Sequence, residues 1–438
     1  MTMEDYSAEA FKLSVEALKR HLAEKMSLKS SLYAAAKSER AKTHALRLAR
    51  RILHLYAIKR LHVKKILREF LGEINLREEE EQLLLELILL AAIEKINLGD
   101  LEEFARRLRA KMGEDRVKGV EPYLGVLRGF QMLEVRGIDE SYPRWFTRYV
   151  SRLVGKHEAM RLLRFQDHEK PPLYLSLNTL ALPPEKILHY LEERGLSLVR
   201  DYRIREVFIL EEVENIKELN DAAKAGLISV HDISSYYAAL ALDVKPGDKV
   251  LDVCAAPGVK TWILAKLMKN RGRIVSVDSS VQRLRSHLRR MRQMKVGIAE
   301  NIIADATHTL PLRKDFDRVL VDPPCSSTGL LWREPSYRWR IKPRHIKMFA
   351  RLQSKILENA SQHVKVDGYL LYSTCSIALE ENEFVVEDFL KRNPEFTLVE
   401  ITPALGGGGM RGLRECRRLY PHRDKCNGFF LAKFLRRW

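Results

Sequence analysis

Two of the chain's five cysteines lie in short polar turns that follow apolar runs. Cys325 belongs to DPPCSSTG, and Cys375 belongs to YSTCS, fifty residues later. Cysteine acts as a nucleophile when its surroundings make the thiolate available. A buried cysteine is the ordinary alternative, but a polar turn at a strand end is a poor place for a core residue. The sequence therefore predicts two reactive thiols in one site, without deciding which of them attacks.

Three aspartates end apolar runs in the same half of the chain: Asp278, Asp305 and Asp322. Helix capping explains one or two such residues but not the whole set. Ligands of open α/β sheets bind beyond the carboxyl ends of the strands, and this much negative charge disfavours a phosphate. We therefore expect S-adenosylmethionine, which has a ribose, an adenine and a positive centre. Asp278 suits the ribose hydroxyls, and Asp305 suits the adenine amino group.

The elements that must position these residues alternate between apolar strands and helices from Lys249 onward. Strands are expected in KVLDVC (249–254), RIVSVD (273–278), GIAENIIAD (297–305), DFDRVLVD (315–322), GYLLYSTCS (368–376), FTLVE (396–400) and GFFLAKFL (428–435). This alternation predicts an α/β domain with a doubly wound, mostly parallel sheet and helices on both faces. The strands that precede Cys325 and Cys375 are expected to be neighbours, so that both thiols open into one crevice.

Composition divides the chain into three regions. Residues 1–145 begin with a long stretch that has no proline and carries apolar residues at helical spacing, which predicts an all-helical domain. Residues 146–232 are expected to form a linker and a small α+β subdomain, and residues 233–438 the catalytic domain. The small subdomain should contain a strand at 173–177, a helix at 184–194, and strands near 207–210 and 227–230.

The net charge of the chain is +18, which favours a polyanionic partner, and RNA is the first candidate. A generally basic proteome is the plainer explanation. No run of about 18 apolar residues predicts a membrane span, and the N-terminus lacks the order of a signal peptide. We expect a cytoplasmic monomer with reduced thiols.

Three motifs together resemble the Fmu/Sun (RsmB, NOL/NOP) family of RNA cytosine-5 methyltransferases: VLDVCAAPGVKT (250–261), DPPCSSTG (322–329) and YSTCSIALEENE (372–383). The likeness extends over about residues 170–438 and includes AGLISVHDISS (225–235) and RLYPHRDKCNGFF (418–430). The N-terminal helices are similar, by architecture and position, to the NusB-like domain of the bacterial 16S rRNA enzyme. The resemblance implies a Rossmann-like, S-adenosylmethionine-dependent methyltransferase domain that acts on rRNA, with tRNA as the open alternative.

The resemblance also implies roles for individual residues. Cys375 would be the nucleophile, Cys325 would serve product release, and Asp322 would lie beside the methyl donor and the target base. The cofactor would be held by Cys254, Ala255, Ala256, Pro257, Gly258, Val259 and Lys260, by Asp278 with Arg283 at the ribose, and by Asp305 at the adenine. Two residues depart from the family pattern. Val259 replaces the second glycine of the cofactor loop, and His231 replaces a glutamine.

The proposed chemistry explains why such an enzyme needs these residue types. Carbon 5 of cytosine is a poor nucleophile, and a thiolate that adds to carbon 6 makes it reactive. An acid near N3 would stabilise the charge on the ring, and Asp322 is the candidate. A second group must then help to remove the C5 proton or release the product.

Several other segments have two interpretations. WREPSYRWRIKPRHIK (332–347) suits base stacking and phosphate contacts, but Trp332 and Trp339 suit packing equally well. The small α+β subdomain is expected to help carry RNA. Cys416 and Cys426, with His422, are too few for a metal site, and a surface loop is expected there.

Two rival functions remain at the level of sequence. A DNA cytosine-5 methyltransferase would place its nucleophile in the proline–cysteine motif and would not need Cys375. A non-catalytic RNA-binding factor for ribosome assembly would have no need to keep Cys375, Asp322 and Lys260.

Overall fold

The structure is a computed structural model of the full chain. It describes all residues except 1–2, 25, 40, 72–78, 95, 97–100, 115–116, 118–119, 121–140, 214 and 313–314. The described residues form two compact units, and each is treated separately below. The first comprises residues 1–167 and 334–340, and the second comprises residues 168–333 and 341–438. Within the described part of the chain, no helix has the length and apolar character that a bilayer crossing requires.

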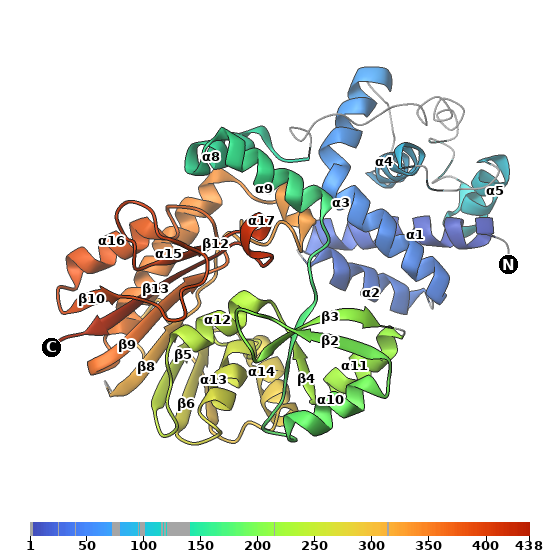
Figure 1. The fold of residues 1–438 in the computed structure, drawn as a ribbon. Coiled ribbons are helices and arrows are strands. Elements are labelled where there is room, and N and C mark those ends of the chain that lie inside the picture. Colours follow the sequence, from blue (N-terminus) through green and yellow to red (C-terminus); the bar gives the residue numbers. More distant parts are fainter. Residues whose placement is uncertain are drawn as a thin grey trace. The chain divides into compact units, whose positions relative to one another are not determined.

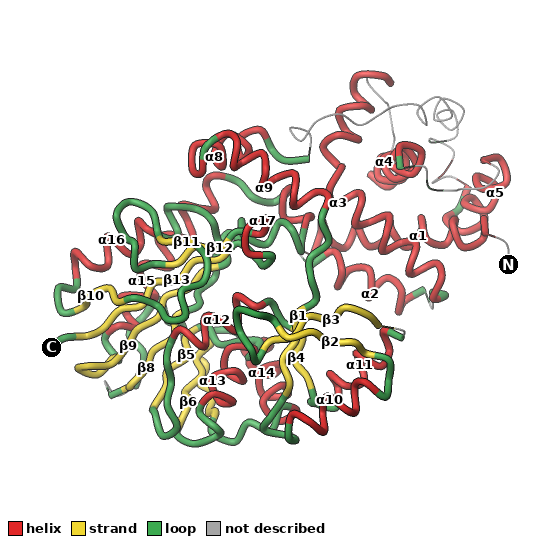
Figure 2. Tube along the Cα trace, in the orientation of Figure 1, coloured by secondary structure: helices red, strands yellow, loops and turns green. Residues whose placement is uncertain are grey.

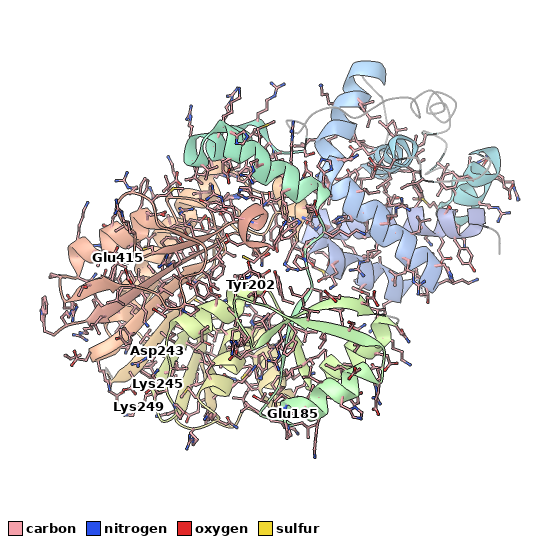
Figure 3. The ribbon with its side chains drawn as sticks, in the orientation of Figure 1. Glu185, Tyr202, Asp243, Lys245, Lys249 and Glu415 are labelled. Carbon is pink, nitrogen blue, oxygen red and sulfur yellow. The ribbon has the colours of Figure 1, made fainter. Side chains whose placement is uncertain are left out.

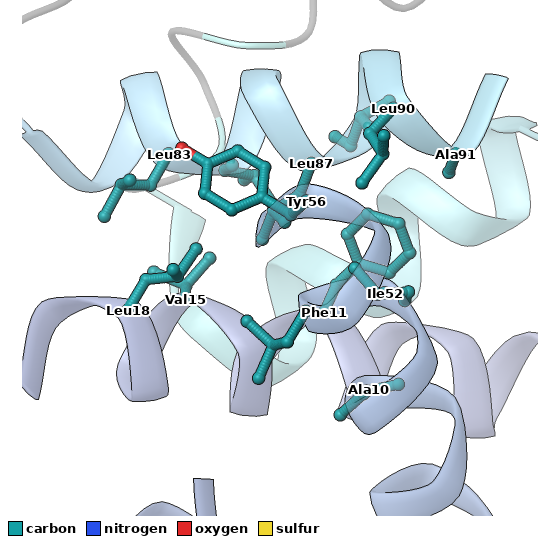
Figure 4. Packing of buried hydrophobic residues seen from close by; sticks show 14 of the residues in the cluster. Ala10, Phe11, Val15, Leu18, Ile52, Tyr56, Leu83, Leu87, Leu90 and Ala91 are labelled. Carbon is teal, nitrogen blue, oxygen red and sulfur yellow. The ribbon is translucent and has the colours of Figure 1, made fainter. Parts of the chain in front are cut away.

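In the residues of the first unit that the structure describes, every regular element is a helix (Figure 1), as the predicted all-helical N-terminal domain requires. Its helices are α1 (Met3–Glu24), α2 (Leu28–Ser38), α3 (Thr43–Leu71), α4 (Glu79–Ile93), α5 (Leu101–Met112), α8 (Arg144–Val154) and α9 (Lys156–His168). Apolar side chains from α1, α3 and α4 interlock in its core, as Figure 4 shows for Phe11, Tyr56 and Leu87. Residue Glu86 is buried beside them and accepts a hydrogen bond from the Tyr56 hydroxyl.

A short segment from the second half of the chain completes this helical core. It is the 3₁₀ helix η3 (Pro335–Trp339). The Trp339 ring packs edge-on against Tyr56 at 5.4 Å, and its Nε1 donates to the Ala57 carbonyl at 3.0 Å. Arg338 is buried and paired with Asp167 at 2.6 Å. The aromatic and basic residues of this segment therefore hold the helical unit together.

The second unit begins with a small sheet of four antiparallel strands in the order β2-β3-β1-β4. Its strands are β1 (Tyr174–Leu177), β2 (Leu196–Arg200), β3 (Val207–Val213) and β4 (Ile228–Val230), with helices α10 (Pro184–Glu192) and α11 (Ile216–Lys224). The sequence predicted this α+β subdomain but missed α11 and missed β2, in which only Leu196 is buried and the apolar signal is weak.

The rest of the second unit is a large mixed sheet (Figure 2) in the order β11-β12-β13-β9-β8-β5-β6-β7, with β10 paired to β13. The strands are β5 (Lys249–Val253), β6 (Arg273–Asp278), β7 (Ala299–Ile303), β8 (Phe316–Val321), β9 (Val364–Thr374), β10 (Phe396–Val399), β11 (Gly407–Gly408), β12 (Arg417–Leu419) and β13 (Phe429–Arg436). The five strands from β5 to β9 run parallel, and β13 is antiparallel to β9. The predicted doubly wound, mostly parallel sheet is confirmed.

Helices cover both faces of this sheet, as its near-continuous apolar strands require. One face packs against α12 (Ile233–Ala241), α13 (Val259–Leu267) and α14 (Val281–Gln293). The other packs against α15 (Pro343–Ser361) and α16 (Glu383–Arg392). A last short helix, α17 (Pro421–Asp424), precedes β13. The predicted neighbourhood of the strands before Cys325 and Cys375 is also confirmed, because β8 and β9 pair directly.

Candidate active site

A cavity of about 250 Å³ lies at the carboxyl ends of β5, β6 and β7. Four of the predicted cofactor residues line it, namely Cys254, Asp278, Arg283 and Asp305. The others are Val277, Ser279, Ala304, Ala306, Thr307, Pro324, Leu352 and Ile356. Pro324 belongs to the predicted DPPCSSTG motif, but most of the others come from the loop after β7 and from α15, which carried no motif.

Asp278 ends β6 and is nearly inaccessible to solvent. Its carboxylate accepts backbone hydrogen bonds from Ala256 at 3.3 Å and Ser280 at 3.0 Å. Arg283 lies 3.3 Å from the same carboxylate and also donates to the Ala256 carbonyl. Asp278 and Arg283 therefore tie the cofactor loop to the end of β6, as well as lining the cavity.

The cofactor loop turns from β5 into α13 through a glycine that the fold requires. Gly258 has a φ of 96°, and a Cβ at this position would lie 2.8 Å from the His287 ring. Val259 follows it as the first residue of α13 and packs against the apolar cluster of that face. A β-branched residue therefore fits where the family pattern has a second glycine.

A buried polar chain supports this loop from behind. The Thr261 hydroxyl lies 2.6 Å from Asp252 and 2.9 Å from Nε2 of His287. Burial raises the pKa of Asp252 to about 7 and lowers the pKa of His287 to about 4. These three side chains lie beneath the loop and do not line the cavity.

Asp305 follows β7 at the rim of the cavity and is exposed. Its carboxylate accepts a hydrogen bond from the Thr307 backbone at 2.9 Å, and that bond lowers its pKa. It therefore carries a negative charge at neutral pH and can accept from a ligand amino group.

Cys325 and Cys375 converge next to the cavity, with their sulfur atoms 2.6 Å apart. Cys325 follows β8 and Cys375 follows β9, and the pairing of those two strands brings the thiols together. The hydrogen bond to Cys375, and then burial, raise the pKa of Cys325. Cys325 is thus held as a thiol, and either sulfur can be the donor in the contact between the two cysteines.

Asp322 lies between the thiol pair and the cofactor loop. One of its oxygens accepts from Lys260 at 2.7 Å and the other accepts from the Ser373 hydroxyl at 2.8 Å. Burial lowers the pKa of Lys260, but the Asp322 charge outweighs it and the net shift is upward. Asp322 therefore accepts hydrogen bonds through both oxygens, and it holds the Lys260 ammonium group as a proton donor at this point.

A buried carboxylate that the sequence did not single out joins the two cysteine turns. Glu381 accepts from the backbone and hydroxyl of Ser326, from the hydroxyl of Ser376 at 2.7 Å, and from the amide of Gln353 at 2.9 Å. Gln353 also donates to the Pro324 carbonyl at 2.9 Å. Burial raises the pKa of Glu381, and its hydrogen bonds oppose that rise. The only signal in the sequence was its place in LEENE, which carried no role.

Two glycines allow three turns to meet beside the thiols. Gly329 donates to the Cys375 carbonyl at 3.0 Å, and Gly428 donates to the Gly329 carbonyl at 2.9 Å. A Cβ on Gly329 would lie 1.9 Å from the Gly428 oxygen. The turns after β8 and β9 and the turn before β13 are therefore locked to one another by backbone contact.

The remaining sequence predictions have mixed outcomes. Trp332 is buried and donates to the Glu169 carbonyl at 2.7 Å, and Trp339 packs against Tyr56, so the structure supports the packing interpretation of both tryptophans. His231 contacts the Ser176 hydroxyl at 3.0 Å and stacks on Tyr236, and burial lowers its pKa to about 4.

The prediction of a surface loop at the last two cysteines is wrong, because Cys416 and Cys426 are both fully buried. No group of residues suited to a metal ion occurs in the described parts of the chain. Arg418, which belongs to the same basic stretch as Cys416, is buried in an ion pair with Glu383. Because Glu383 neutralises Arg418, this basic segment can be buried although it carries a charge.

The fold and the site define a class of protein. A doubly wound sheet with an acidic cavity at its carboxyl edge, beside a pair of thiols, is the architecture of a Rossmann-like methyltransferase. The chain belongs to the 16S rRNA methyltransferase RsmB/F family, whose sequence profile matches residues 239–435.

Individual relatives agree with this assignment. The chain is 30% identical to ribosomal RNA small subunit methyltransferase B of Yersinia pseudotuberculosis over 72% of each chain. It is 36% identical to the human 28S rRNA (cytosine(4447)-C(5))-methyltransferase over 72% of this chain, but it spans less than half of that relative, at 42%. The crystal structure of PH0851 has a TM-score of 0.84 and 26% identity, and the match covers 98% of this chain and 99% of that one.

Proposed function

We propose that this protein is an S-adenosylmethionine-dependent RNA methyltransferase that forms 5-methylcytosine in ribosomal RNA. The observation that carries the proposal is the convergence of Cys325 and Cys375 at 2.6 Å, beside the Asp322–Lys260 pair. A DNA cytosine-5 enzyme has no need for the second thiol. A non-catalytic binding factor has no need for an ion pair beside two convergent thiols.

The residues of the cavity fit S-adenosylmethionine. A buried carboxylate, Asp278, suits the ribose hydroxyls, and the side chains of Leu352 and Ile356 suit the flat faces of adenine. The rim carboxylate of Asp305 suits the adenine amino group. When bound, this cofactor supplies an electrophilic methyl group.

Cys375 is the proposed nucleophile. Its thiolate attacks carbon 6 of cytosine, which forms the C6–S bond and makes carbon 5 nucleophilic. Lys260 supplies a proton or a positive charge to the polar edge of the base, and Asp322 orients that ammonium group. Asp322 itself, with both oxygens already accepting hydrogen bonds, is assigned to positioning and not to donating a proton.

Cys325 is the proposed release residue. After carbon 5 gains its methyl group, the C5 proton must leave and the C6–S bond must break. The Cys325 sulfur is in contact with the departing Cys375 sulfur. The C5 proton passes to a solvent water, its C–H electrons restore the C5–C6 double bond, and the C6–S electrons return to the Cys375 sulfur. The Cys325 thiol assists by donating a hydrogen bond to the Cys375 thiolate as it leaves.

Ribosomal RNA is the proposed substrate because the family and both named relatives are rRNA methyltransferases. Transfer RNA is the alternative to be tested. We also propose that the protein acts as a monomer, since one chain supplies every side chain of the site. A reducing compartment such as the cytoplasm is supported by five free cysteines.

Bisulfite sequencing of total RNA from cells with and without the gene tests the function. The proposal expects the loss of 5-methylcytosine at one or a few positions in rRNA. Loss in tRNA alone would correct the substrate, and no lost mark in any RNA would refute the enzyme. Purified protein with Cys375→Ala should fail to restore the mark, whereas wild-type protein should restore it.

A further inference from the structure

A second, more open hollow lies beside the cofactor cavity and shares Asp305, Thr307 and Leu352 with it. Its volume is about 770 Å³. The rest of its lining comes from one helix, α15, through Arg344, Lys347, Met348, Arg351 and Lys355. These positions are spaced by three or four residues, so they lie on one face of the helix. We call this hollow the α15 groove.

Among the residues that the structure describes, the four cations of the α15 groove have no anionic partner. Arg344, Lys347, Arg351 and Lys355 are all exposed, and none forms an ion pair or a side-chain hydrogen bond within the described residues. Some other exposed cations of this unit are paired, as Arg392 is with Glu358 and Asp388. Neighbouring like charges on one face of a helix repel and destabilise it, so the stripe does not serve helix stability and a bound anion would relieve the repulsion.

The geometry of the stripe suits an extended polyanion. From Arg344 to Lys355 the helix rises about 16 Å, a length over which a nucleic-acid strand presents several phosphates. Met348 lies between the cations with 54% of its surface exposed, which offers an apolar surface to a base. A small anion would need only one or two of these cations.

The opposite face of α15 connects the groove to the thiols. Gln353 is fully buried, and its amide donates to the Pro324 carbonyl and to Glu381. Pro324 precedes Cys325, and Glu381 holds the turn that carries it. A polyanion bound in the groove would therefore contact the same helix that fixes the release cysteine.

We propose that the α15 groove binds the single-stranded RNA that flanks the target cytosine. The inference rests on the proposed function and adds the path of the substrate. The phosphates contact Arg344, Lys347, Arg351 and Lys355, and a flanking base packs on Met348. The groove thereby positions the RNA without contributing to the chemistry at carbon 6.

The test compares two quadruple variants that remove the same charge. The first is R344Q/K347Q/R351Q/K355Q. The control is K245Q/K249Q/R271Q/R273Q, whose residues are exposed at the amino ends of β5 and β6, away from the cofactor edge (Lys245 and Lys249 are labelled in Figure 3). Arg351→Glu, a single reversal in the middle of the stripe, serves as a second groove variant. Thermal unfolding of each variant checks that it is folded.

Binding of a short fluorescent single-stranded RNA is measured by anisotropy over a range of salt concentrations. For the groove variant, the affinity should fall at least about tenfold, and the slope of log K against log salt should become less steep by about 3, at about 0.7 for each lost phosphate contact. The control should lose much less, and the affinity for S-adenosylhomocysteine should stay at the wild-type value in all variants.

Three results would overturn the groove proposal. The first is an equal loss of RNA affinity in both quadruple variants, and the second is an unchanged RNA affinity in the groove variant. The third is a groove variant that loses affinity for polyglutamate, used as a protein polyanion, but keeps its affinity for RNA. These binding measurements need no methyl transfer. An enzyme that methylates RNA but binds it without the groove would refute this inference alone, and absence of methylation in every RNA would refute the proposed function.

Discussion

The two carboxylate oxygens of Glu381 accept hydrogen bonds from different kinds of donor, and this difference leads to a specific prediction. One accepts from the Ser326 backbone and the Gln353 amide, which can only donate. The other accepts from the hydroxyls of Ser326 and Ser376, which can turn and accept instead. Glu381→Gln can therefore keep all four contacts, with its carbonyl toward the obligate donors and its amide toward the hydroxyls. Glu381→Ala loses all four.

The expected magnitudes follow from this difference. A buried donor left without a partner costs about 1–3 kcal/mol, and Glu381→Ala strands two such donors, so its unfolding free energy should fall by about 2–6 kcal/mol. The turns of Cys325 and Cys375 also lose their common anchor. A displacement of about 1 Å at reacting atoms costs about a hundredfold in rate. Glu381→Gln should lose about 1 kcal/mol and keep most of its rate.

The assay is single-turnover methyl transfer from labelled S-adenosylmethionine to RNA, at a temperature where both variants are folded by circular dichroism. Urea unfolding gives the stability of each variant. The account expects a rate loss of about a hundredfold for Glu381→Ala, without a matching loss of cofactor affinity. A full rate in Glu381→Ala, or equal damage in Glu381→Gln, would refute the role assigned to this carboxylate.

Three further predictions concern separate parts of the site. The buried Asp252, with a pKa of about 7, stabilises the fold while it is protonated, and that stability is lost as the pH rises through 7. In urea unfolding, the unfolding free energy should therefore fall by about 2–3 kcal/mol between pH 5 and pH 8, and Asp252→Asn should remove this fall. The same fall in the variant would contradict the assignment. Gly329→Ala should lower the unfolding free energy by about 3 kcal/mol or more, since its Cβ would lie 1.9 Å from the Gly428 oxygen; a wild-type denaturation curve would disprove the close contact. Lys260→Met should abolish methyl transfer but leave the binding of S-adenosylhomocysteine, measured by calorimetry, intact. The reason is that Lys260 pairs with Asp322 and does not line the cavity. Loss of that binding would place Lys260 at the cofactor instead.

The sequence was sufficient to predict the alternation of strands and helices along the catalytic domain and the meeting of Cys325 with Cys375. Both follow from rules that act along the chain, since apolar runs alternate with helices and consecutive parallel strands tend to pair. The acidic residue at the end of β6 was predictable for the same reason, because strand ends are visible as breaks in the apolar pattern.

Other features depend on contacts between distant segments, and the sequence could not reveal them. The role of Glu381 exists only because α15 brings Gln353 to the two cysteine turns. The choice between stacking and packing for Trp339 was decided by a partner in α3. Cys416 is buried because Arg418, in the same basic stretch, finds Glu383 on α16.

Trapping of a covalent RNA–protein adduct tests the central claim most directly. Each cysteine variant is incubated with substrate RNA and S-adenosylmethionine and is then separated on a denaturing gel. The account predicts that Cys325→Ala accumulates the adduct, because Cys375 can attack but the product is not released, and that Cys375→Ala forms none. An adduct in Cys375→Ala but not in Cys325→Ala would contradict the assignment of Cys375 as the nucleophile.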